Sequence, residues 1–144
     1  MKYLYLYLDL FTLAGPLLLS FDKKVAFYKK WKALFPSILI MSVIFIAWDI
    51  YFTQIGVWGF NPNYLSGVYF FNLPIEECLF FLVVPYACMF IYECLNAYLK
   101  IDYFKKLYRI IFSVLALLLI ILAAIFYNQL YTSITFGGCG ILIL

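Results

Sequence analysis

Histidine is absent from this 144-residue chain. Its absence removes the commonest transition-metal ligand and the usual acid–base group at neutral pH. Cysteine is scarce, and the four that occur form no CxxC pair and lie in apolar surroundings: Cys78, Cys88, Cys94 and Cys139. They are typical of small hydrophobic residues, so we expect neither a metal site nor a disulfide framework.

Charge is also scarce. Only 12% of the residues are charged and 68% are hydrophobic, whereas a soluble domain averages roughly 25% and 45–50%. The mean hydropathy is +1.04, which predicts an integral membrane protein, because so short a chain has no soluble core able to bury this surface. The net charge of +3 predicts membrane topology and no nucleic-acid partner. The chain has no GxGxxG, P-loop, HExxH or nucleophile elbow, so no cofactor is expected.

Long apolar runs are what the chain has in place of charge. They predict an all-α, polytopic membrane bundle of four spanning helices and a partial fifth, at about 3–21, 34–55, 73–99, 110–126 and 130–144. The last run is partial because Ser133–Leu144 would extend about 18 Å, short of a ~30 Å hydrocarbon core.

Basic residues give the topology. Nine of the ten Lys and Arg residues lie in two loops, Asp22–Lys32 and Lys100–Arg109. By the positive-inside rule both loops are predicted to be cytoplasmic. The N-terminus and the Gly56–Asn72 loop, which contains no charged residue, are then expected outside a multi-pass cell (inner) membrane.

The stretch VYFFNLPIEECLFF (Val68–Phe81) places Pro74 and two carboxylates at the start of an apolar run. Proline suits the first turn of a helix, and the helix dipole favours Glu76 and Glu77 there. A carboxylate within a membrane costs about 2.5–3.5 kcal/mol on insertion scales. One acidic cap would suffice, so the second indicates a functional site.

Two further acids are expected in the same leaflet, because Asp9 and Asp49 each lie about two turns inside the outer end of a predicted helix. Lys2 is the sole basic residue of that half, so we expect at least one of these acids to be protonated. A tyrosine from a neighbouring helix could alternatively bond Asp9. Glu93 is predicted roughly 24 Å further along the helix, as a paired or snorkelling charge.

A protonated carboxyl, a carboxylate and an aromatic lining could protonate an alkene, stabilise the carbocation and remove a proton. The predicted catalytic residues are Glu76 and Glu77 as proton donor and acceptor, with Asp49 and Asp9 in support. Pro74 belongs to the same motif, and Trp48, next to Asp49, is the expected cation stabiliser. From these residues alone, a small proton-coupled carrier subunit fits equally; its carboxyls should be spaced through the full membrane depth.

The chain resembles the lycopene cyclase domain family of the heterodimeric and fused type. The resemblance rests on a PxEE signature (Pro74 to Glu77) framed by WGFNP upstream and FF downstream. The matching stretches are Tyr3–Phe21, Phe27–Pro36, Trp48–Gly67, Phe71–Pro85, Phe90–Asn96 and Leu130–Phe136. It implies an isomerase, or intramolecular lyase, of carotenoid biosynthesis that cyclises the ends of lycopene to β-rings without a cofactor. It also implies that the acidic pair is catalytic, and leaves open β- against ε-rings.

Fused members of that family contain two three-helix repeats joined by a linker helix. The resemblance therefore divides this chain into one repeat (1–99), a basic loop and linker helix (100–129) and the opening of a second repeat (130–144). The expected partners are the carotenoid substrate, the lipid bilayer and a second cyclase repeat or subunit. Alone, the chain is expected to be inactive, or to be a non-catalytic partner that completes another chain's site.

Overall fold

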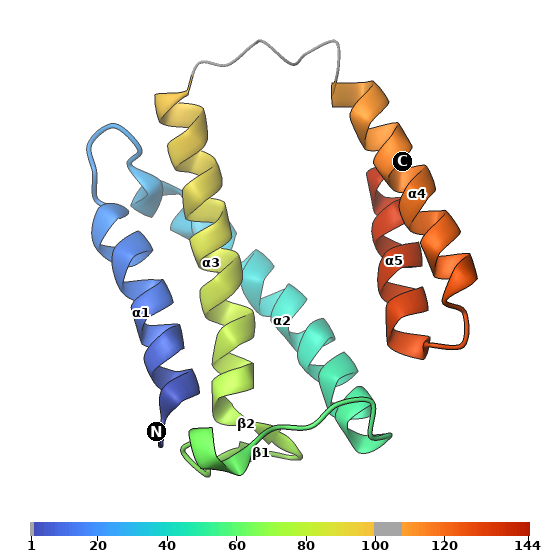
Figure 1. The fold of residues 1–144 in the computed structure, drawn as a ribbon. Helices are drawn as coiled ribbons and strands as arrows, with labels where there is room; N and C mark the ends of the chain where they lie inside the picture. Colours follow the sequence, from blue (N-terminus) through green and yellow to red (C-terminus); the bar gives the residue numbers. More distant parts are fainter. Residues whose placement is uncertain (1, 100–107) are drawn as a thin grey trace. The chain divides into compact units, whose positions relative to one another are not determined.

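The computed structural model describes residues 2–99 and 108–144. The chain divides after Leu99 into two compact units. The elements of the first unit are α1 (Leu4–Leu19), η1 (Phe27–Lys30), α2 (Trp31–Gln54), η2 (Pro62–Tyr64), β1 (Tyr69–Phe70), β2 (Leu73–Pro74) and α3 (Ile75–Tyr98). Those of the second are α4 (Tyr108–Ile125) and α5 (Leu130–Ile143) (Figure 1). The all-α prediction is confirmed, with one two-stranded hairpin added.

Three helical stretches are long and apolar enough to cross a membrane: 27–54, 75–98 and 108–125. Four spanning helices were predicted, and three helices of the structure are long enough to span. Helix α1 has 16 residues and extends about 24 Å. The helix ends at Leu19, before the predicted end at 21, and Ser20 is its C-terminal cap. The Ser20 N–H donates to the Leu17 carbonyl oxygen, and the Ser20 hydroxyl donates to the Pro16 carbonyl oxygen. Helix α5 has 14 residues, in keeping with a partial fifth.

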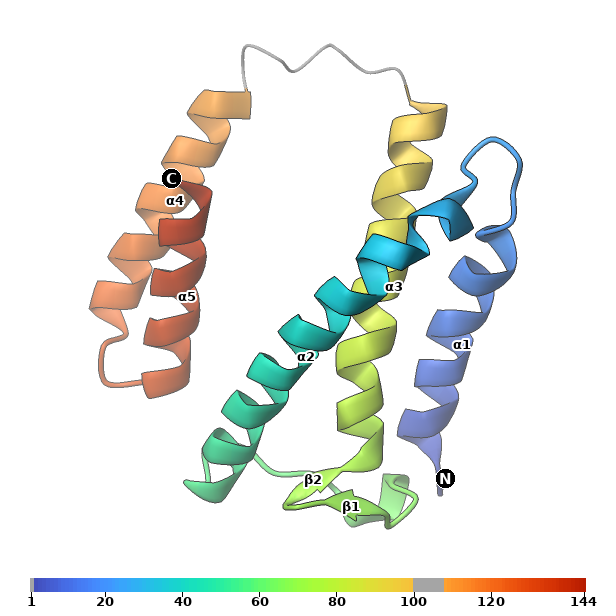
Figure 2. The ribbon, with the colours of Figure 1, turned by 180° about the vertical axis from the view of Figure 1, so that it is seen from behind.

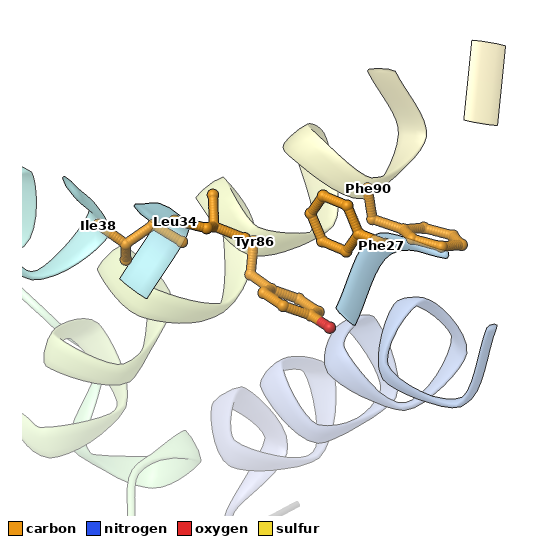
Figure 3. Packing of buried hydrophobic residues seen from close by; sticks show 5 residues of the cluster. All are labelled: Phe27, Leu34, Ile38, Tyr86 and Phe90. Carbon is orange, nitrogen blue, oxygen red and sulfur yellow. The ribbon is translucent and has the colours of Figure 1, made fainter. Parts of the chain in front are cut away.

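Helix α3 is the centre of the first unit and packs against both α1 and α2 (Figures 1 and 2). Phe27, Leu34 and Ile38 from η1 and α2 form a buried cluster with Tyr86 and Phe90 from α3 (Figure 3). Inside a bilayer, close packing between such side chains, rather than their removal from water, holds neighbouring helices together. The cluster thus fixes α2 against α3.

A hydroxyl pair ties α3 to α1 beside that cluster. The Tyr86 hydroxyl lies 2.6 Å from Ser20 Oγ, and Ser20 Oγ also lies 2.6 Å from the Pro16 carbonyl oxygen. Serine has a single hydroxyl hydrogen, which goes to that carbonyl, so Tyr86 is the donor of the pair. Both side chains are buried. The hydroxyl pair gives each of these buried polar groups a hydrogen-bond partner.

The β1–β2 hairpin lies at the end of the first unit where the N-terminus also lies (Figures 1 and 2). Tyr69 pairs with Pro74 and Phe70 with Leu73. The segment predicted as a plain loop is thus partly ordered as strand. Pro74 is extended and precedes α3, so the helix begins at Ile75, two residues later than the predicted start at 73, and Pro74 is not in its first turn. Pairing with Tyr69 holds it in that extended conformation.

Charged side chains join the elements at the end away from the hairpin. Lys30 forms an ion pair with Glu93, which confirms Glu93 as a paired charge. Asp22 accepts hydrogen bonds from the Lys24 backbone N–H at 2.6 Å and from the Tyr98 hydroxyl at 2.9 Å. These donors, the backbone N–H first, hold the pKa of Asp22 below its usual value. The second predicted basic loop, 100–109, lies outside the described residues up to position 107.

In the second unit, α4 packs against α5. Gly140 allows the helices to approach closely, because a Cβ there would lie 2.7 Å from Ile120 Cγ1 and 3.1 Å from the Ala116 carbonyl oxygen. The Ser133 hydroxyl donates to the Ala123 carbonyl oxygen at 3.1 Å. The two helices therefore form a packed helix pair whose remaining surface is largely apolar and exposed.

Candidate functional site

Four carboxyl groups from three helices meet near the hairpin end of the first unit. Asp9 comes from α1, Asp49 from the last turns of α2, and Glu76 and Glu77 from the first turn of α3. The exposed fraction is 8% for Asp9, 3% for Asp49 and 2% for Glu76, while Glu77 is half-buried. The structure thus brings together all four acids that the sequence singled out.

These groups interact electrostatically from one helix to the next. The Glu77 carboxylate is repelled by those of Asp49 and Asp9, and Asp9 is repelled by Glu76 as well. No ion pair in the described residues involves any of the four; the ion pair that the described residues contain joins Lys30 to Glu93. Four carboxyls without a cation cannot all be ionised cheaply in apolar surroundings. The cluster is thus suited to holding and passing a proton.

The two glutamates of the pair have different surroundings. Oε1 of Glu76 accepts the backbone N–H of Ser66 at 2.6 Å, and the Ser66 hydroxyl lies against the same carboxylate. Oε2 of Glu76 is buried and has no hydrogen-bond partner among the described residues. For Glu77, the described residues supply no hydrogen-bond donor. One glutamate is therefore fixed by the loop and the other is not.

An aromatic stack lies beside Asp49. The rings of Trp48 and Phe52 are stacked at 4.8 Å, and those of Phe52 and Trp58 at 5.2 Å. The Trp58 indole N–H donates to Thr53 Oγ1 at 3.1 Å and also interacts with the Asp49 carboxylate. Oδ2 of Asp49 is buried without a partner among the described residues. Trp48 therefore lies next to the acids, as predicted, within a wall of π-faces that could stabilise positive charge.

Asn72 connects the hairpin to α2. Its Nδ2 donates to the Ile50 carbonyl oxygen at 3.0 Å, while its Oδ1 is buried without a partner in the described chain. Ile50, Gln54, Phe71 and Asn72 line a shallow cleft there. Leaving a buried acceptor unpaired costs about 1–3 kcal/mol. Three such oxygens, on Asp49, Glu76 and Asn72, therefore lie together at this end of the unit.

Sequence reasoning missed five contributors to this site: Phe52, Thr53, Trp58, Ser66 and Asn72. Trp58 lies in the WGFNP frame, which gave a signal for the family but none for a contact with Asp49. Ser66 gave no signal, because it acts largely through a backbone N–H that every residue except proline carries. Among the described residues, Pro74 forms no hydrogen bond with the four acids. It pairs with Tyr69 in the hairpin, directly before the first turn of α3 that contains Glu76.

The comparisons with known proteins identify the family of the chain. A family model described as lycopene cyclase matches residues 2–95, which include all four acids. A bifunctional lycopene cyclase/phytoene synthase of Aspergillus oryzae is 29% identical over 69 residues, 48% of this chain and 12% of the relative. One of Colletotrichum graminicola is 30% identical over 63 residues, 42% of this chain and 11% of the relative. No solved structure matches significantly.

Proposed function

The chain belongs to the lycopene cyclase family, and we propose that its four carboxyls cyclise the end groups of lycopene to β-rings. The observation that carries this proposal is the cluster of Asp9, Asp49, Glu76 and Glu77, of which the first three are buried, with unpaired oxygens on Asp49 and Glu76 and no ion pair among the described residues. The whole activity is a proposal because the matched stretch covers only 12% and 11% of the two curated relatives.

The reaction needs a proton and no oxidant. A carboxylic acid gives its proton to the terminal double bond of lycopene, whose electron pair forms the new C–H bond and leaves a tertiary cation. The neighbouring double bond attacks that cation, so that a C–C bond closes the six-membered ring and the positive charge moves into it. A carboxylate then removes a ring proton, and the released electron pair becomes the ring double bond. Product and substrate are isomers.

The surroundings of the acids favour each step. The apolar environment strengthens the electrostatic interaction between a carboxylate and a developing cation. The Trp48–Phe52–Trp58 stack offers π-faces, worth about 0.5–2 kcal/mol for a nearby cation. Which ring proton is lost, and hence β- or ε-ring, depends on where the accepting carboxylate lies. We assign β-rings by resemblance to the family.

We further propose that the hairpin end faces the outer leaflet of the inner membrane, with the basic Asp22–Lys32 loop in the cytoplasm. The bilayer would then supply lycopene laterally to the acids. A second three-helix repeat or subunit is the proposed partner. A carrier with carboxyls throughout the membrane depth is less well supported, because Glu93 pairs with Lys30 and is unavailable for a relay.

Pigment analysis tests this function. Cells that accumulate lycopene should produce γ-carotene and β-carotene when they express this chain together with a second cyclase repeat. Cells expressing the repeat alone are the control. Extracts that contain only lycopene, although both polypeptides are present in the membrane, would contradict the proposal.

A further inference from the structure

We propose that Ser66 is a positioning residue that gives the two adjacent glutamates different tasks, with Glu76 as the fixed proton acceptor and Glu77 as the proton donor. This inference rests on the proposed cyclase function and deepens it. It follows from the contacts of the two carboxylates, which differ although the residues are neighbours on one helix turn.

Ser66 holds one carboxylate oxygen and leaves the other available. Its backbone N–H lies 2.6 Å from Oε1 of Glu76, a short, charge-assisted geometry. Its hydroxyl oxygen accepts the Val68 N–H at 3.3 Å, so the hydroxyl hydrogen can be directed to the same carboxylate. With Oε1 fixed in this way, Oε2 remains buried and unpaired among the described residues, where it can take a proton.

The loop, rather than α3, sets where the Ser66 N–H points. Leu65 is buried and anchors the residue before Ser66. Gly67 has φ +90°, a left-handed conformation that glycine adopts without steric cost. The Ile75 N–H then bonds the Val68 carbonyl oxygen at 3.0 Å. Ser66 is therefore held from both sides against the first turn of α3.

Glu77 has the surroundings of a group that gives up a proton. Neighbouring helix residues point about 100° apart, so Glu77 faces away from the donors of Ser66. Its charged neighbours are Asp9 from α1 and Asp49 from α2, and neither can donate a hydrogen bond as a carboxylate. No ion pair among the described residues involves Glu77. A proton on Glu77 relieves this repulsion until the substrate takes it.

With these two roles, the acids take up one proton for each proton that they give. The proton leaves Glu77 for the terminal alkene, and after ring closure a ring proton moves to Oε2 of Glu76. The acids return to their starting state when that proton goes back to Glu77. Asp9 interacts electrostatically with both glutamates, and we assign to it the transfer of that proton between them.

Deuterium labelling tests this division in membranes holding the active assembly in D₂O buffer. The parent should form rings that each carry one deuterium from Glu77. Glu77→Gln should leave lycopene both uncyclised and unlabelled. Glu76→Gln keeps an oxygen for Ser66 but loses the acceptor, so its cation should revert and return labelled, uncyclised lycopene. Labelled lycopene from Glu77→Gln, or unlabelled lycopene from Glu76→Gln, would overturn the assignment.

Variants of Ser66 test its positioning role. Ser66→Ala should slow cyclisation about fivefold, the effect of one hydrogen bond, and should raise the deuterium in recovered lycopene, which a purely structural role would not do. Ser66→Thr, which keeps the hydroxyl, should match the parent in both the cyclisation rate and the deuterium content of recovered lycopene. Ser37→Ala is the matched control, since the exposed Ser37 hydroxyl bonds only the Ala33 carbonyl oxygen of its own helix at 2.9 Å.

The outcomes separate the two proposals. A parent assembly that forms no rings would refute the cyclase function itself. A parent that cyclises, with Ser66→Ala matching it in rate and labelling, would refute the positioning role while leaving the function intact. If Glu76→Gln fails to accumulate in the membrane, the Ser66→Ala and Ser66→Thr pair decides the question.

Discussion

Lys30 and Glu93 form an ion pair at the end of the first unit away from the hairpin. The pair accounts for the one glutamate of α3 outside the cluster, and it joins η1 to the last turns of α3. The Lys30 side chain is 54% exposed and the Glu93 side chain 16%, so the pair is closer to a surface ion pair than to a buried one. Its task is structural.

Glu93→Gln should therefore leave cyclisation at the parental rate. The unfolding free energy should fall by no more than about 1 kcal/mol, the upper range for exposed pairs. Pigment extraction measures the first effect and thermal unfolding in detergent the second. A loss of ring formation in a well-folded Glu93→Gln protein would place this glutamate in the catalytic machinery instead.

The turn between α1 and α2 should loosen in acid. Asp22 has a pKa below its usual value because the Lys24 N–H and the Tyr98 hydroxyl donate to it. A depressed folded pKa stabilises the fold above the unfolded value, about 3.9, and this contribution is lost as the pH falls through the folded value. Thermal unfolding between pH 7 and pH 3 should show that loss.

Asp22→Asn is the matched variant for that titration, because it keeps an oxygen acceptor and cannot ionise. Its unfolding temperature should be lower than the parent's at pH 7, and the difference should shrink as the pH falls below the unfolded pKa and through the folded one. Parallel curves across the whole range would show that the ionisation of Asp22 contributes nothing to stability.

Gly67→Ala should weaken both the hairpin end and the site. The left-handed φ of +90° at Gly67 strains any residue with a Cβ, typically by about 1–3 kcal/mol. Relief of that strain would move the Ser66 N–H away from Glu76, so cyclisation should slow as stability falls. Gly59→Ala is the control, since Gly59 has open space and no positive φ. Equal behaviour of the two variants would count against the loop as a positioning device.

Periodicity and charge predicted the coarse architecture. Apolar runs located the helices, and counting residues from the loops placed Asp9, Asp49 and the glutamate pair on one side of the unit. The length of α1 was overestimated because hydropathy does not detect the Ser20 cap. The hairpin was missed because its strands have two residues each, too few for an alternating pattern.

The finer parts of the site could not be read from the sequence for a physical reason. The contact from Ser66 to Glu76 uses a backbone N–H, so residue type carries little information about it. The stack of Trp58 on Phe52 depends on how the loop after α2 folds back. Such contacts are fixed by loop conformation, which composition and helical periodicity do not specify.

The most direct test of the acidic cluster as a cyclase site is the pigment made by Glu76→Gln and Glu77→Gln in the active assembly, with Glu93→Gln as control. Glutamine keeps the shape of glutamate but cannot release or accept the proton. We predict that either variant accumulates in the membrane at the parental level and leaves lycopene uncyclised, while Glu93→Gln makes β-carotene at the parental rate. β-Carotene at the parental rate from both variants of the pair would contradict the account.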